Sequence, residues 1–249
     1  MPCRAFLIAL LSSALLCAAA ATARAGAYQY DARMAFIKAG KLELNLSRQG
    51  KDYEVVGEFQ TSKAMSAYYR WNGIFAARGE WAPRGPVTQA YMSRTVSKGE
   101  KLKIVLNTEA GVRLLDGAEN SFESIDKPQG IDLISALFFT PECYQGGTVN
   151  DGEDTYQLQL RSQKDQRMSG GKDYYSGAVT VCKYNVIDHK DRKRRIEVSL
   201  ASVDGSVMTV QVRAKIPVLP DAVFKLRLPP RALDGAAVAQ IATGSEISR

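Results

Sequence analysis

Apolar and polar residues alternate with a period of two along most of the chain from residue 28 onward, which is the pattern of β-strands with one buried face. Within residues 41–47, for example, leucine alternates with polar residues. Turns are expected at Ala39-Gly40 and at Gln49-Gly50-Lys51. Three strands joined by such short turns favour antiparallel pairing.

The same alternation predicts further strands, about eleven or twelve in all. They fall at residues 73–77, 87–96, 102–106, 112–114, 156–160, 178–187, 196–200, 208–216 and 223–228. Residues 63–71 mix helical and strand character, whereas residues 116–130 and 163–172 have the composition of loops. No linker-like or repeated segment interrupts residues 26–232, so they are expected to form one β-rich domain. Residues 233–249 lose the alternation and are expected to be a flexible C-terminal tail.

Residues 131–139 form the one convincing helix in the sequence. Asp132 suits its N-cap, and Pro141 ends the segment. The helix is short and apolar on nearly every side, so we expect it to be buried against a sheet.

So many consecutive strands must curl or split to protect their edges. The pattern therefore predicts an all-β, mainly antiparallel fold. We expect a large curved sheet that forms an open or incomplete β-barrel around the one short buried helix.

The N-terminal 25 residues have the features of a cleaved signal peptide. Arg4 precedes an apolar stretch over residues 5–21, and Ala23 and Ala25 provide the small residues of a cleavage site before Gly26. The stretch is shorter than the ~20 residues of a spanning helix. Lipidation at Cys17 is disfavoured because Leu16 stands where a small residue is normal. We expect a periplasmic protein that is not lipidated and has no transmembrane segment after cleavage.

Two of the four cysteines, Cys143 and Cys182, remain after cleavage. An even pair in an oxidising compartment favours a structural disulfide. A metal site would need more ligands, and a redox couple usually has closely spaced cysteines. The loop that the bond closes predicts a stabilisation of about 4 kcal/mol.

Loss of Arg4 and Arg24 would lower the formal net charge from +7 to +5. The basic residues concentrate in residues 189–195, where contact with anionic lipid or lipopolysaccharide phosphates would involve Lys190, Arg192, Lys193, Arg194 and Arg195. The alternative is a solvated hairpin turn. Nucleic acid is not an expected partner, because no aromatic platform accompanies the basic run.

The sequence contains one histidine, His189, within that charged turn, and it lacks GxSxG, HExxH and glycine-rich phosphate-binding motifs. We therefore expect that the protein is not an enzyme and that it binds no cofactor and no metal. A carboxylate-dependent enzyme acting on envelope polysaccharide or lipid is kept as a lesser alternative.

The most prominent remaining feature is a set of aromatic and apolar residues. Either these residues fill the core, or they line an apolar groove suited to an acyl chain or an apolar peptide. The candidate groove residues are Tyr68, Tyr69, Trp71, Phe75, Trp81, Tyr91, Leu133, Leu137 and Phe138.

Several short segments, in their order and spacing, resemble the bacterial exported domain of unknown function 3108 (DUF3108) family. They are residues 28–31, 37–42, 67–71, 77–81, 131–137, 151–152 with 156–158, and 178–184 around Cys182. The resemblance covers residues 28–228. It implies an envelope location and a curved, barrel-like β fold, and it implies no activity.

These observations favour a non-enzymatic envelope protein that binds a lipid, a lipoprotein or an apolar peptide in a curved-sheet groove. The alternative is a structural or protein-interaction module that supports envelope integrity or assembly.

Overall fold

Fifteen strands form one continuous sheet in the computed structural model, which describes residues 24–67, 70–83, 85–97, 101–117, 121–215 and 220–228. The first eight strands are β1 (Arg24–Met34), β2 (Ile37–Gln49), β3 (Asp52–Thr61), β4 (Trp71–Ala82), β5 (Gly85–Ser97), β6 (Leu102–Thr108), β7 (Gly111–Asp116) and β8 (Glu123–Ile125). The others are β9 (Ile131–Asp132), β10 (Gly146–Asn150), β11 (Thr155–Met168), β12 (Gly177–Ile187), β13 (Lys193–Val203), β14 (Ser206–Lys215) and β15 (Ala222–Leu226). Two short helices are α1 (Lys63–Ser66) and α2 (Leu133–Phe138).

The strand order shows how the chain builds this sheet. The first described strand, β1, lies in the middle of the sheet, and β2 to β8 follow it in order to one edge. The chain then crosses to β9 at the other edge, and β10 to β15 follow in order back to β1. Among the described strands, β9 and β10 pair in parallel and all other neighbours pair antiparallel. Because consecutive strands are neighbours, short turns suffice almost everywhere.

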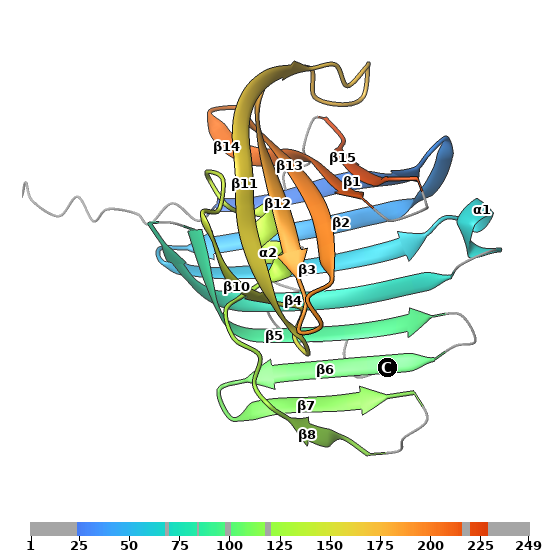
Figure 1. Cartoon of the computed structure of the whole chain (residues 1–249), viewed down its shortest axis with the longest axis vertical. Coiled ribbons are helices and arrows are strands. Elements are labelled where there is room, and N and C mark those ends of the chain that lie inside the picture. Colours follow the sequence, from blue (N-terminus) through green and yellow to red (C-terminus); the bar gives the residue numbers. More distant parts are fainter. Residues whose placement is uncertain are drawn as a thin grey trace, which may run out of the picture.

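The sheet curls so that its two halves face each other. In Figure 1 the strands β2–β8 lie one below another across the view, and β11–β13 cross in front of them, with α2 between the two layers. Within the described residues the edge strands β8 and β9 do not pair with each other, so the sheet is open there. The predicted fold class is therefore confirmed, including the one buried helix.

Hydrogen bonds at both ends of α2 attach it to opposite halves of the sheet. At its N-terminus, fully buried Asp132 caps the helix by accepting from the Ser135 N–H at 2.8 Å. Asp132 also accepts a hydrogen bond from the hydroxyl of Thr88 on β5, and its own N–H donates to that hydroxyl at 3.0 Å. At the other end, the Thr209 hydroxyl of β14 donates to the Leu137 carbonyl at 2.8 Å.

The disulfide between Cys143 and Cys182 is confirmed. It joins the segment after α2 to β12, and both residues are buried. The bond therefore holds the chain that leaves the helix against the second half of the sheet.

Several element predictions were wrong at turns and edges. The first hairpin turns at Ala35–Phe36 rather than at Ala39-Gly40, because Met34 pairs with Ile37. The predicted loop over residues 163–172 is in part the continuation of β11, which pairs with β12 as far as Met168. Beyond Gln159 no described strand pairs with the other side of β11, and its exposed charges Lys164, Asp165 and Arg167 discourage pairing there with another chain.

The expected signal peptide and C-terminal tail lie almost wholly outside the described residues. The exception is the start of β1, where Arg24 and Ala25 pair with Arg48 and Ser47 of β2. Cleavage before Gly26 would shorten β1 by these two residues and leave its other pairs in place. Among the described residues, no helix has the length and apolar character needed to cross a membrane.

Replacing both Cys143 and Cys182 with alanine is expected to lower the free energy of unfolding by about 4 kcal/mol, because the open chain regains loop entropy. Equilibrium urea unfolding measures this change. Wild-type protein unfolded in the presence of a reductant is the control and should match the variant. A loss below about 1 kcal/mol would show that the bond does not constrain the unfolded chain as assumed.

Two buried carboxyls predict opposite effects of pH on stability. Burial raises the pKa of Asp132, and hydrogen bonds from Thr88 and Ser135 oppose only part of that rise. Burial also acts to raise the pKa of Asp31. There the hydrogen bond from Tyr174, 2.6 Å long, and the charges of Lys38 and Arg227 outweigh burial and lower it. The ordinary pKa of an aspartate is 3.8. The stabilising effect of Asp132 therefore decreases as the pH rises above 3.8, whereas that of Asp31 decreases as the pH falls below 3.8.

The matched variants Asp132→Asn and Asp31→Asn test this contrast by urea unfolding at several pH values between about 3 and 7. The stability difference between wild type and Asp132→Asn should shrink as pH rises, and the difference for Asp31→Asn should grow. Two differences that change in the same direction with pH would refute the assignment.

Candidate functional site

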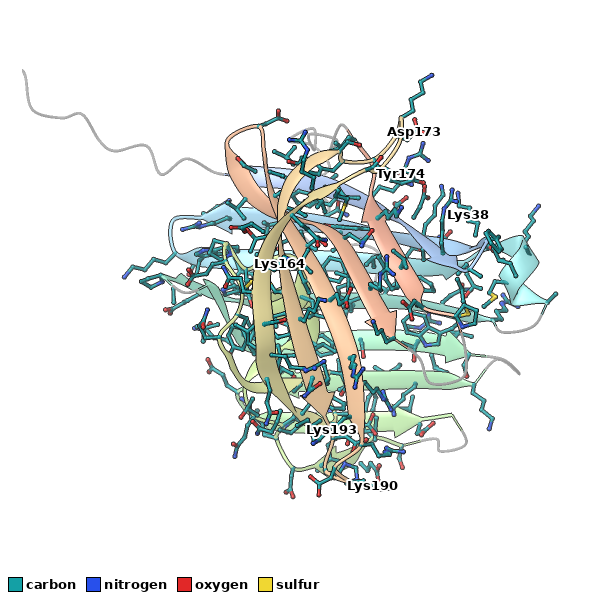
Figure 2. The ribbon with its side chains drawn as sticks, turned by 45° about the horizontal axis from the view of Figure 1, so that its top comes forward. Lys38, Lys164, Asp173, Tyr174, Lys190 and Lys193 are labelled. Carbon is teal, nitrogen blue, oxygen red and sulfur yellow. A yellow bond between two sulfur atoms is a disulfide. The ribbon has the colours of Figure 1, made fainter. Side chains whose placement is uncertain are left out.

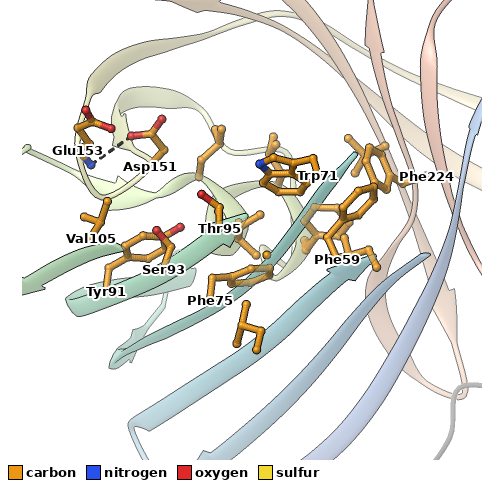
Figure 3. Close-up of a pocket in the computed structure, with 18 of the residues that line it drawn as sticks. Phe59, Trp71, Phe75, Tyr91, Ser93, Thr95, Val105, Asp151, Glu153 and Phe224 are labelled. Atoms are coloured by element: carbon orange, nitrogen blue, oxygen red, sulfur yellow. Dashed lines mark hydrogen bonds between the residues drawn. The ribbon is translucent and has the colours of Figure 1, made fainter. Parts of the chain in front are cut away.

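An apolar cavity of about 390 Å³ lies between the two halves of the sheet, beside α2. Residues from both halves, from α2 and from the β10–β11 turn contribute to its wall (Figure 3). The lining residues are Leu42, Phe59, Trp71, Gly73, Ile74, Phe75, Tyr91, Ser93, Thr95, Lys103, Val105, Leu133, Ile134, Leu137, Phe138, Asp151, Glu153, Ile196, Val212, Ala214 and Phe224.

One end of the cavity is aromatic. The ring of Phe59, at the end of β3, lies 4.9 Å from that of Trp71 and 6.1 Å from that of Phe224. Because Phe224 belongs to β15 and the other two to β3 and β4, the contact joins the two halves of the sheet (Figure 3). The backbone N–H of Trp71 donates to the Thr61 hydroxyl at 2.9 Å, which fixes the start of β4.

In the middle of the cavity, the position of the Phe75 ring depends on a glycine of the neighbouring strand. Phe75 of β4 lies over Gly57 of β3, its direct cross-strand partner. A Cβ atom at position 57 would lie 2.0 Å from the Phe75 ring, so a larger residue there would displace the ring. The side chains of Leu133, Leu137 and Phe138 on α2 line the cavity as well.

The other end of the cavity is polar, because the turn after β10 closes over it. Asp151 accepts from the N–H groups of Glu153 and Asp154, at 3.2 and 2.8 Å, and from the Tyr156 hydroxyl at 2.8 Å. Between them, Gly152 has a φ of +96° and lies against Tyr91, where a Cβ would be 2.4 Å from the ring. The site is therefore aromatic at one end and charged at the other (Figure 3).

The charge states at the polar end follow from its contacts. Burial acts to lower the pKa of Lys103, but the hydrogen bond and the charge of Glu153 outweigh burial, and the net effect raises that pKa. The Lys103 ammonium therefore stays charged. Burial, and then the charge of Asp132, raise the pKa of Tyr91 above its ordinary value of 10.0. Its hydroxyl is therefore protonated at neutral pH and can donate a hydrogen bond.

Six of the nine predicted groove residues line this cavity: Trp71, Phe75, Tyr91, Leu133, Leu137 and Phe138. Trp81 lies elsewhere, with its ring 6.0 Å from that of Tyr53 and beneath the guanidinium of Arg48. Tyr68 and Tyr69 lie outside the described residues.

Sequence reasoning missed Phe59 and Phe224, which complete the aromatic end, and the polar residues Ser93, Thr95 and Lys103. The alternation of Tyr53, Val55, Gly57 and Phe59 along β3 is a signal that could have placed Phe59 on the inner face. No sequence signal showed that β15 would lie close to β3 and β4.

The basic run at residues 189–195 spans the hairpin turn between β12 and β13 and the first three residues of β13, Lys193 to Arg195. Asp188 organises it by accepting from the N–H groups of Lys190 and Arg192, and it pairs with the Arg192 guanidinium at 2.7 Å. Figure 2 shows Lys190 and Lys193 at the end of this hairpin. The cations are exposed there and do not border the cavity. Across the described part of the chain, no three His, Cys, Asp or Glu side chains gather in a way that could hold a metal ion.

Comparisons with known proteins assign no family. No family model matches the sequence, and no curated protein matches it. A solved structure of a DUF1329 family protein from Desulfovibrio piger is similar over 85% of each chain, with 13% identity and a TM-score of 0.25. That TM-score is too low to transfer a fold or a function. The expected resemblance to the DUF3108 family is wrong, because no family model matches the sequence.

Proposed function

We propose that this protein binds an apolar or amphipathic component of the bacterial envelope in the cavity between the two halves of its sheet, without catalysing a reaction on it. The observation that supports the proposal is the cavity itself. Its volume of about 390 Å³ falls in the usual range for small-molecule sites, roughly 300–1,000 Å³. Its wall combines many apolar side chains with a few polar groups, as ligand sites do.

The attachment of α2 explains why this space is not filled by collapse of the core. Protein interiors normally pack without voids of this size. Here the Asp132–Thr88 and Leu137–Thr209 hydrogen bonds fix the helix to β5 and to β14. The two halves of the sheet therefore cannot close on each other without breaking buried hydrogen bonds, each of which would leave unsatisfied polar groups.

The asymmetry of the cavity suggests how a ligand would lie. An apolar chain would contact Phe59, Trp71 and Phe224, where large rings offer apolar surface. A polar group at the other end would meet the hydroxyls of Ser93 and Thr95 and the Lys103–Glu153 ion pair. An amphipathic molecule with one polar end fits this arrangement better than a uniformly apolar one.

Export is part of the proposal and rests on the N-terminal sequence. The disulfide supports it, because such bonds persist mainly in oxidising compartments such as the periplasm.

Filling the cavity tests the proposal. Ala214 of β14 lines the cavity, so Ala214→Trp should occupy the space and weaken binding of the apolar dye 8-anilinonaphthalene-1-sulfonate at least tenfold. Ala178→Trp is the matched control, because Ala178 is an exposed position of β12 outside the cavity wall. Dye titrations with direct excitation of the dye give both affinities.

The control variant should bind the dye as the wild type does. Equal affinity in wild type and Ala214→Trp would contradict the proposal, since the dye would then bind elsewhere. Unfolding curves of both variants verify that each is folded.

A further inference from the structure

We propose that the end of the molecule formed by the β1–β2 hairpin and α1 docks onto an anionic membrane surface. This docking tip consists of Arg33, Phe36, Ile37, Lys38 and Lys63. Phe36 is 101% exposed and Ile37 is 46% exposed, which places both among the exposed large apolar side chains of the described residues. The docking proposal does not depend on a ligand in the cavity.

The hairpin holds Phe36 out in solvent. The loop contains only Ala35 and Phe36, because Met34 and Ile37 already pair across β1 and β2. Ala35 has a φ of +51°, a conformation that alanine adopts rarely. Tips of two-residue hairpins usually carry Gly, Asn or Asp, which suit water and this backbone. Here two apolar residues occupy the loop and a third follows it, so the sequence has placed apolar surface at an exposed position.

Positive charge surrounds this apolar surface. Arg33 and Lys38 flank the hairpin tip on β1 and β2, and both are exposed. Lys63 of α1 joins them, since Ser62 fixes the start of α1 beside β2 through its N–H to the Ala39 carbonyl at 2.9 Å. Exposed aromatic and aliphatic groups ringed by Lys and Arg are typical of surfaces that enter the interface of anionic lipid membranes.

The basic turn at residues 189–195 is a weaker candidate for the same role. It has cations but no apolar side chain. Each surface has one paired cation, Arg192 with Asp188 in the turn and Lys38 with Asp31 at the tip, so the exposed apolar side chains distinguish the two. Figure 2 shows Lys38 beside α1, well apart from Lys190 and Lys193. The two basic surfaces can therefore be tested separately.

The register of the sheet places the docking tip at the aromatic end of the cavity. Ala32 pairs with Phe224, which pairs with Val212, and Met34 pairs with Ala222, which pairs with Ala214. Phe224, Val212 and Ala214 all line the cavity, and the hairpin tip follows Met34 directly. If the proposed function holds, docking at this tip brings the aromatic end of the cavity toward lipid.

Vesicle sedimentation tests the docking. The protein is isolated after export from a bacterial host, and its partition is measured on phosphatidylcholine vesicles with and without phosphatidylglycerol. Wild type should bind the anionic vesicles, and added salt should weaken that binding. Phe36→Ser should lower the partition coefficient about tenfold, which corresponds to about 1.4 kcal/mol.

Val207→Ser is the matched control. Val207 is 49% exposed, so its replacement removes an exposed apolar group outside the docking tip. It stands seven residues from Ala214 along β14, roughly 23 Å away at about 3.3 Å per residue, and so at the far end of that strand. This variant should partition as the wild type does.

Three results would overturn the docking proposal: no binding of wild type to anionic vesicles, equal losses in Phe36→Ser and Val207→Ser, or equal binding to vesicles without anionic lipid. Failure of docking is distinguishable from failure of the proposed function. Phe36→Ser should keep wild-type affinity for 8-anilinonaphthalene-1-sulfonate, and Ala214→Trp should keep wild-type partition to vesicles.

Discussion

The attachment of α2 to both halves of the sheet is the constraint on which the rest of the structure depends. The helix is too short and too apolar to exist alone, and the curled sheet around it has two unpaired edges. Asp132 and Thr88 join the helix to one half, and Thr209 joins it to the other. The Tyr30 hydroxyl donates to the Thr209 carbonyl at 2.8 Å, and the Tyr30 ring packs edge-on against Phe138. Together these contacts fix the spacing that leaves the cavity open.

Much of the fold could be predicted from the sequence because its causes are local. Alternation identified most strands, the Asp132 cap and the apolar run identified α2, and two remaining cysteines identified the disulfide. The failures lie where the causes are not local. The end of β11 has charged residues in place of apolar ones, because it is an exposed edge, so alternation could not reveal it. The first turn was misplaced because Gly40 looked like a turn residue. In the structure it lies within β2, where a Cβ would lie 2.3 Å from the Gln60 carbonyl oxygen.

The candidate site was predictable in part for the same reason. Aromatic residues within one strand or one helix can be grouped from sequence, and six of the predicted residues do line the cavity. Phe224 could not be grouped with Phe59, because their proximity depends on how the sheet curls. Trp81 was misassigned because its strand continues past the cavity to Tyr53 and Arg48. Strand periodicity shows which face a residue occupies, but it does not show what lies opposite that face.

Native mass spectrometry of the exported protein, purified without detergent from its own source, tests the central claim most directly. The account predicts a complex of the disulfide-bonded chain with an apolar or amphipathic molecule that dissociates on denaturation and is absent from Ala214→Trp. A mass equal to the polypeptide alone under gentle conditions would contradict it. An attached molecule retained equally by Ala214→Trp would contradict it as well, because the molecule would then lie outside the cavity.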